Sequence, residues 1–254
     1  MLHEKIRSDL TTLGYKGMLQ SFEENLELKT LSSSFQQSLY RIIQAEVAHR
    51  SSRSLAYRLD LAKLPQIKTL EQFDLNNVAF DSEKLTTLCQ YDFIQRSENI
   101  LIIGGSGTGK THIALSLGYG AISQRYRVKF YRFGDLAKQL QMAKQNNRLD
   151  NLIAILCRFD LFIIDELGYL PVDQSAGELL FELFTQLYET TSVLITTHLS
   201  FDEWDTIFGN KKSTKAIIDR LTHHCNILET GNKSWRLKST MENQQQQNKE
   251  VKEK

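Results

Sequence analysis

A glycine-rich motif of eight residues constrains this chain more than any other part of its sequence. The motif, Gly104-Gly105-Ser106-Gly107-Thr108-Gly109-Lys110-Thr111, matches the pattern G-x-x-x-x-G-K-[ST] in full. An apolar run at 100–103 precedes it, and residues 111–123 continue with helical spacing. Glycines let the backbone turn so that N–H groups face phosphate oxygens, and a helix N-terminus favours negative charge. The order of strand, loop and helix therefore predicts a phosphate-binding loop rather than a turn without function.

The polar residues of this loop have expected partners in a nucleotide such as ATP. Lys110 should reach the β- and γ-phosphates, and the Thr111 hydroxyl should bind Mg²⁺. We expect residues 104–111 and the following His112 to form the nucleotide-binding site. Gly118 and Gly120 lie inside the predicted helix, where glycine lowers helix stability. We interpret these two glycines as a sign that the helix packs closely on a sheet.

Short apolar runs alternate with helical patterns after about residue 98. Besides 100–103, such runs occupy residues 128–133, 161–164, 193–196 and 225–228. Continuous apolar runs are typical of strands that are covered on both faces. We predict an α/β fold, a doubly wound parallel sheet flanked by helices.

The N-terminal part has helical periodicity instead. Ile6, Leu10 and Leu13 share one helix face, and Leu19, Phe22 and Leu26 share another. A third helix should begin at a capping box of Ser34 and Gln37 and end before Pro65. Its apolar stripe comprises Phe35, Leu39, Ile42, Ile43 and Val47. We predict an all-helical domain over residues 1–64, a connector over 65–75, an ATPase domain over 76–238 and a disordered, Gln-rich tail over 239–254.

Two acidic residues, Asp165 and Glu166, follow the apolar run at 161–164. Ligands bind at the carboxyl ends of strands in doubly wound sheets. Asp165 is suited to hold Mg²⁺ through water, together with Thr111, and Glu166 is suited to polarise the water that attacks the γ-phosphate. A kinase for a small molecule needs no such base, so the pair favours an ATP hydrolase.

Two further polar positions are candidates for the same chemistry. Thr197 or His198, at the end of the run at 193–196, can sense the γ-phosphate, or be an ordinary strand end. Arg220 lies on a helical segment before the last strand. It can reach the nucleotide of a neighbouring subunit, or form a salt bridge on the surface. We also expect Phe73 and Phe80 to pack either on adenine or in the core.

The formal net charge is only +1, so any nucleic-acid binding must come from a local patch. The best candidate is the third helix and its end, with Arg50, Arg53, Arg58 and Lys63. These residues can contact DNA phosphates. The alternative is a solvated helix face on which Glu46 pairs with Arg50.

Cellular location is inferred from absent signals. The three cysteines, Cys89, Cys157 and Cys225, are odd in number and far apart, which favours reduced thiols over disulfides or a zinc site. We find no signal peptide and no apolar run long enough to span a membrane. We therefore expect a soluble, cytoplasmic protein with no membrane partner.

Several stretches of the chain resemble the IstB-like ATPases, which assist DDE transposases of bacterial insertion sequences. The generic loop carries less of this resemblance than Leu167-Gly168-Tyr169-Leu170-Pro171 and Arg220-Leu221-Thr222-His223-His224. Residues 46–65, 68–74 and 198–204 add to it, so that it covers roughly residues 1–238. Where the family has asparagine, this chain has His198, so the sensor assignment departs from the family pattern.

The resemblance implies a five-stranded parallel AAA+ core and an ATPase. It implies a homo-oligomer that assembles on duplex DNA with nucleotide at subunit interfaces, and delivery of that DNA to a transposase encoded nearby. It makes Arg220 an arginine finger and places His223-His224 in a packing helix rather than a metal site. The related DnaC-type helicase loaders are the alternative, with an N-terminal domain that grips a helicase. The basic third helix and the Arg-Leu-x-His-His stretch favour the transposition helper.

Overall fold

The computed structural model describes residues 2–27, 32–73, 82–169, 174–208 and 211–231. The predicted tail, Phe80 and the Leu170-Pro171 pair lie outside these ranges. The chain forms two compact units, Met1–Tyr57 and Arg58–Lys254. Within the described ranges, no helix combines the length and the apolar character that a membrane span requires.

The first unit consists of helices α1 (Leu2–Leu13), α2 (Lys16–Glu27) and most of α3 (Ser33–Ala62). Its core is the cluster of Ile6, Leu10, Leu13, Phe22 and Ile43. These are residues from the predicted apolar faces, because helical spacing brings them to one side.

Two details of α3 correct the sequence-based prediction. The helix begins at Ser33, and Ser32 Oγ accepts a hydrogen bond from Phe35 N at 3.3 Å, so Ser34 is not the N-cap residue. Ile42 and Phe35 are 67% and 51% exposed, so the buried stripe is narrower than predicted. In this unit α1 and α2 cover only one side of α3, so the residues on its other side remain exposed.

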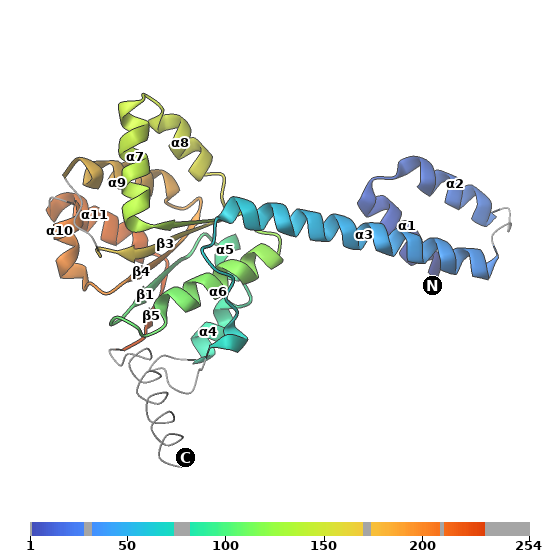
Figure 1. The fold of residues 1–254 in the computed structure, drawn as a ribbon, viewed down its shortest axis with the longest axis horizontal. Coiled ribbons are helices and arrows are strands. Elements are labelled where there is room, and N and C mark those ends of the chain that lie inside the picture. The colour runs from blue at the N-terminus through green and yellow to red at the C-terminus, as the bar shows by residue number, and fades with distance from the viewer. Residues whose placement is uncertain (1, 28–31, 74–81, 170–173, 209–210, 232–254) are drawn as a thin grey trace, which may run out of the picture. The chain divides into compact units, whose positions relative to one another are not determined.

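The second unit is built on a parallel sheet of five strands in the order β2-β3-β4-β1-β5 (Figure 1). The strands are β1 (Asn99–Ile103), β2 (Val128–Arg132), β3 (Leu161–Leu167), β4 (Ser192–Thr197) and β5 (Cys225–Glu229). The prediction of a parallel sheet is confirmed, and the observed strand ends differ from the predicted ones by at most three residues. Strand β4 lies between β1 and β3, so the polar residues at its end lie beside both the glycine-rich loop and the acidic pair.

Helices cover both faces of this sheet. Helix α6 (Lys110–Ser123) lies on one face together with the short helices α4 (Ser82–Leu88) and α5 (Asp92–Gln95) (Figure 1). The other face packs against the remaining helices, which are α7 (Phe133–Gln145), α8 (Leu149–Leu156), α9 (Gln174–Leu187), α10 (Asp205–Phe208) and α11 (Lys211–Thr222). The described residues of this unit also include the 3-10 helices η1 (Leu70–Gln72) and η3 (Phe201–Trp204).

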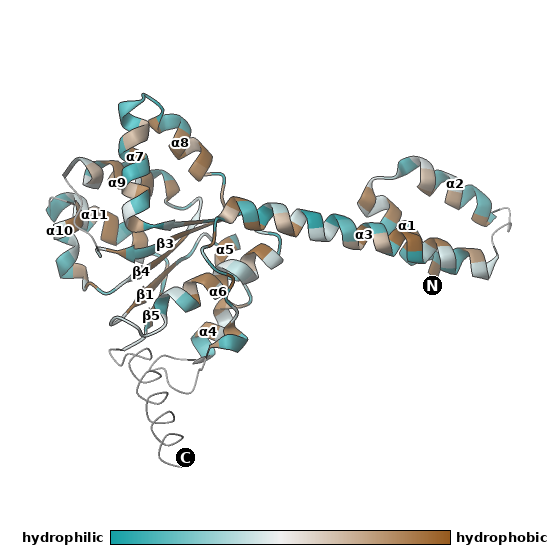
Figure 2. Ribbon diagram, in the orientation of Figure 1, coloured by the Kyte–Doolittle hydropathy of each residue, from teal (hydrophilic) through white to brown (hydrophobic). Residues whose placement is uncertain are grey.

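The central strands β1, β3 and β4 are largely apolar, as Figure 2 shows. Alternate residues serve the two layers: Phe162 and Ile164 belong to the core shared with α7–α11, whereas Ile163 faces α6. A Cβ built at Gly118 would lie 2.7 Å from Ile163 Cδ1, so the predicted close packing of α6 on the sheet is confirmed there. A Cβ built at Gly120 would instead collide with the Tyr91 hydroxyl, so this glycine makes room for Tyr91 and not for the sheet.

The end of α3 belongs to the second unit. Arg58 Nε donates to Ile122 O at 3.2 Å, and Lys129 Nζ donates to Leu61 O at 3.1 Å. Burial lowers the pKa of Lys129. The predicted boundary after residue 64 therefore differs from the structural one after Tyr57, because apolar spacing shows where a helix runs but not which core its last turns join.

Candidate nucleotide-binding site

The glycine-rich loop connects β1 to α6, the arrangement that the sequence predicts. Gly107 and Gly109 have φ of +77° and +95°, a region that only glycine enters easily. Lys110 Nζ donates to the loop carbonyls of Gly104 at 2.8 Å and Gly105 at 2.7 Å. The ammonium group is therefore positioned over the loop, where phosphates bind in such motifs.

The two residues that follow β5 form hydrogen bonds with this loop. Gly105 N donates to Gly231 O at 2.9 Å, and the Thr108 and Thr230 hydroxyl oxygens are 2.6 Å apart and buried. A Cβ on Gly104 would collide with Thr230. The role of Thr230 is not apparent from the sequence, because 122 residues separate it from Thr108 and leave no local signal.

Thr111 and Asp165 come together from α6 and β3. The Thr111 hydroxyl is 2.9 and 3.1 Å from the two carboxylate oxygens of Asp165. Asp165 is only 2% exposed. Hydroxyl and carboxylate oxygens are the ligands that Mg²⁺ prefers, so this donor set fits the predicted metal.

Glu166 has a different environment from Asp165. Its side chain is exposed at the carboxyl edge of the sheet. Its φ is +63°, which is uncommon for a residue other than glycine. The β3–β4 register shifts between Ile164 and Leu167, so the strand bulges where the two carboxylates follow each other. A bulge redirects a side chain out of the regular ladder.

The residues at the end of β4 divide between structural and exposed positions. The buried Thr197 hydroxyl donates to Leu167 O at 2.9 Å and accepts from Leu199 N at 3.1 Å. Both of these hydrogen bonds are to backbone atoms, so the Thr197 hydroxyl has a structural role. His198 is exposed and lies edge-on to Tyr169, with 6.5 Å between the ring centroids. Of the two predicted sensors, His198 is the one whose side chain reaches solvent beside the acidic strand.

Phe73 and His112 lie at the other end of the loop. A Cβ on Gly109 would collide with the Phe73 ring, and this ring is 5.1 Å from that of His112. His112 Nε2 is 3.0 Å from Thr69 O. An aromatic ring from the connector thus borders the loop.

Arg220 is not brought to the loop of its own chain. Its Nη1 donates to Thr185 Oγ1 at 3.0 Å, and its Cζ lies 5.3 Å from the Phe181 ring centroid. The adjacent Leu221 O accepts from Asn99 Nδ2, at the first residue of β1. The loop follows the carboxyl end of β1. Arg220 therefore lies near the amino ends of the strands, on the opposite side of the sheet from the loop.

The predicted DNA-binding residues differ in how much of their side chain is engaged. Arg50 contacts Glu46 Oε1 at 2.7 Å, Leu13 O at 2.9 Å and Tyr15 Oη at 2.7 Å, and the bonds from Arg50 and Tyr15 lower the pKa of Glu46. Lys63 pairs with Asp60 at 2.7 Å, and Arg58 bonds to α6 as described above. Arg50, Arg53 and Lys63 are all exposed, whereas Arg58 is partly buried.

The cysteines are half-buried free thiols. Burial raises the pKa of Cys225 to about 11 and also raises the pKa values of Cys89 and Cys157. A high pKa keeps a thiol protonated and unreactive. These residues therefore have the properties of packing residues.

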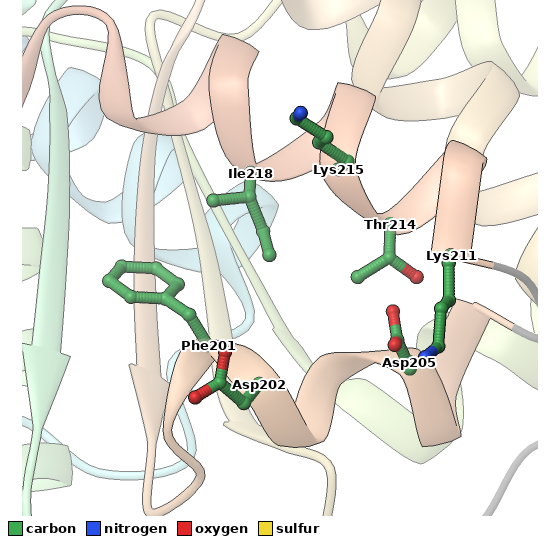
Figure 3. Close-up of a pocket in the computed structure, with 7 residues that line it drawn as sticks. All are labelled: Phe201, Asp202, Asp205, Lys211, Thr214, Lys215 and Ile218. Carbon is green, nitrogen blue, oxygen red and sulfur yellow. The ribbon is translucent and has the colours of Figure 1, made fainter.

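A separate surface pocket of about 400 Å³ opens between η3, α10 and α11 (Figure 3). Its charged lining residues are Asp202, Asp205, Lys211 and Lys215, and Phe201, Thr214 and Ile218 complete it. Two carboxylates balance two ammonium groups, so this pocket has no charge that would select a phosphate. It contains none of the predicted site residues.

Comparison with known proteins places this geometry in a family. The family described as IstB-like ATP binding protein matches residues 8–243. A relative from Pseudomonas aeruginosa, named for insertion sequence IS21 and for ATP binding, is 36% identical over 87% of this chain and 83% of its own length. A relative from Geobacillus stearothermophilus, named for insertion sequence IS5376 and ATP binding, is 35% identical over 82% of this chain and 84% of its own.

Solved structures agree on the fold. The DnaC helicase loader has a TM-score of 0.54 at 18% identity and is matched over 96% of its length and 64% of this chain. DnaA from Aquifex aeolicus with bound AMPPCP has a TM-score of 0.53 at 20% identity, over half of its chain and 66% of this one. The second unit thus has the AAA+ fold, and the chain belongs to the family of IstB-like ATP-binding proteins.

Proposed function

We propose that this protein hydrolyses ATP, and that its nucleotide state controls assembly on duplex DNA in support of a transposase encoded nearby. The main support for ATP hydrolysis is the hydrogen bond between Thr111 and Asp165 at 2.9 Å. The exposed Glu166 follows Asp165 directly in the chain. This arrangement combines phosphate binding, a metal-binding donor set and a carboxylate that is open to water at one edge of the sheet.

Each residue has a distinct part in the proposed reaction. The loop N–H groups and Lys110 bind the phosphate oxygens and offset their charge. Thr111 and Asp165 would hold Mg²⁺, which neutralises charge on the β- and γ-phosphates when it is bound. Glu166 accepts a hydrogen bond from the attacking water and orients it toward phosphorus. Phe73 packs against the adenine, and His198 donates or accepts a hydrogen bond at the γ-phosphate.

Arg220 requires a second subunit for its proposed role. It lies near the amino ends of the strands, whereas its own loop lies at the carboxyl ends. It can therefore complete only the site of a neighbouring molecule. Its ring contact with Phe181 and its bond to Thr185 would hold the guanidinium in place for that interface. An arginine that stabilises transition-state charge from a neighbour makes hydrolysis dependent on assembly.

The insertion-sequence relatives support the transposition part of the proposal. Relatives at 30–36% identity that span most of this chain are named for three different insertion sequences. The likeness to the DnaC helicase loader is at 18% identity and supports the fold alone. The family evidence therefore favours a transposition helper over a helicase loader.

The test is sedimentation of the purified full-length protein with a duplex of about 60 base pairs at low salt. Wild type, Glu166→Gln and Lys110→Ala are compared with ATP, with ADP and without nucleotide. We expect ATP to drive wild type into a large complex with DNA that decays as phosphate is released. Glu166→Gln should bind ATP, release phosphate at least about 100-fold more slowly and keep the complex, whereas Lys110→Ala should not assemble.

Two outcomes separate the parts of the proposal. Binding of ATP without any nucleotide-dependent association with duplex DNA would reject the transposition role and direct the search to a helicase partner. Wild-type phosphate release by Glu166→Gln would reject Glu166 as the residue that activates water.

A further inference from the structure

Thr196, the residue of β4 before Thr197, lies between the two acidic residues of the site. Its hydroxyl donates to Asp165 Oδ1 at 2.6 Å and accepts from the backbone N of Glu166 at 2.9 Å. The residue is 0% exposed. Neither bond can therefore be replaced by water without rearrangement of the strands.

The chemistry of the groups fixes the direction of both bonds. An ionised carboxylate only accepts hydrogen bonds, and a backbone N–H only donates. Thr196 has one hydroxyl proton, which must go to Asp165, and a lone pair, which takes the Glu166 N–H. One side chain thus links the Thr111–Asp165 pair to the backbone of Glu166.

The bulge explains why a side chain is needed at this point. Ile164 pairs with Ile195 and Leu167 with Thr197, so Asp165 and Glu166 together face the single residue Thr196. The Thr196 hydroxyl satisfies the Glu166 N–H within this irregular stretch. The Thr197 hydroxyl bonds to Leu167 O on the far side of the bulge. The two threonines therefore hold both sides of the segment in which Glu166 has its φ of +63°.

We infer that Thr196 is a positioning residue that couples the orientation of the Asp165 carboxylate to the backbone conformation of Glu166. This inference rests on the proposed ATP hydrolysis. By holding Asp165, the hydroxyl keeps the carboxylate facing Thr111. By holding the Glu166 N–H, it keeps the exposed Glu166 side chain directed out of the sheet at the loop. The same hydroxyl serves both, so its loss affects the metal-binding group and the water-activating group together.

The variants are Thr196→Val, which keeps the shape and removes the hydroxyl, and Thr196→Ser, which keeps the hydroxyl. Thr191→Val is a matched control: Thr191 is also buried, immediately precedes β4, and donates to Phe159 O at 3.2 Å, outside the site. The measurements are kcat and KM for ATP, and the Kd of a fluorescent ATP analogue with Mg²⁺ and with EDTA. Thermal melting checks that each variant is folded.

We expect Thr196→Val to lower kcat by about 10- to 100-fold and to raise KM by about fivefold. The gain in analogue affinity on adding Mg²⁺ should fall by about fivefold or more, because Asp165 is no longer oriented. Thr196→Ser should restore both quantities to within about threefold of wild type, and Thr191→Val should leave both unchanged.

The proposal is overturned if folded Thr196→Val keeps the wild-type kcat and Mg²⁺-dependent gain, or if Thr191→Val loses as much of either. If Thr196→Val does not fold, Thr196→Ala against Thr196→Ser decides, with the same losses expected for Ala alone. If wild type releases no phosphate, the proposed function fails. The Mg²⁺-dependent gain in affinity then still tests Thr196 by itself.

Discussion

At the scale of single residues, two consecutive carboxylates have opposite environments. Asp165 is 2% exposed and accepts hydrogen bonds from Thr111 and Thr196. Glu166 is exposed and its backbone is held in an uncommon conformation. A buried carboxylate held by hydrogen bonds is suited to bind a metal ion in a fixed position. A carboxylate that reaches water is suited to act as a base. The division of roles thus follows from burial and hydrogen bonding rather than from residue type.

Arg53 and Arg50 provide a prediction at this scale. Arg53 is exposed, so Arg53→Ala should weaken duplex binding and lower the slope of log K against log salt by about 0.9, the loss of one phosphate contact. Arg53→Lys should keep the slope. Arg50→Ala should act instead on stability, because Arg50 bonds to Glu46, Leu13 O and Tyr15. The check is fluorescence anisotropy over a salt series, and an unchanged slope for Arg53→Ala would remove Arg53 from the DNA contact.

At the scale of elements, helix α6 shows how a weak helix former can be required. Gly118 has no room for a larger side chain, because Ile163 of β3 and Leu64 and Val128 lie around it. Close approach lets α6 contact four strands of the sheet and so brings the loop at its N-terminus over the strand ends. The entropy that glycine loses in a helix is offset by this packing.

We predict that Gly118→Leu lowers the free energy of unfolding by about 2 to 3 kcal/mol or more, since the extra atoms overpack the helix–sheet interface. The melting temperature should fall by about 4–12 °C. Gly17→Leu in α2 is the control, because a Cβ there meets nothing within 4 Å. Equal melting of Gly118→Leu and wild type would show that α6 can shift without loss.

The elements were predictable to a larger extent than the contacts between them. All five strands and α6 follow from apolar runs and the loop motif, because burial on both faces leaves a strong sequence pattern. The roles of Thr196 and Thr230 did not follow. Their partners Asp165 and Thr108 are 31 and 122 residues away, and only the sheet register brings these hydroxyls together. The Ser34 cap failed because serines at 32, 33 and 34 offer three equivalent starts.

At the scale of the whole molecule, the last turn of α3 is part of the second unit. Ala62 is 0% exposed, and Leu61 O accepts from Lys129. Leu64 lies near Gly118. The 30 residues of α3 therefore contribute to two cores in succession.

This predicts a difference between two fragments. A chain that starts at Arg58 should be more stable than one that starts at Pro65 by about 2 kcal/mol or more, because the shorter chain loses buried apolar surface and the Arg58 and Lys129 hydrogen bonds. The expected difference in melting temperature is about 4–8 °C, measured by calorimetry. Identical melting would place residues 58–64 with the N-terminal unit.

The docking of Thr230 and Gly231 on the loop has a mechanical consequence. Strand β5 is an edge strand, and Gly231 is bonded to the loop residue Gly105. Tension applied at Gly231 would act on this bond and on the Thr230–Thr108 contact before it reaches the central strands. A force applied at Gly231 in a single-molecule experiment would therefore loosen the glycine-rich loop before it unfolds the sheet.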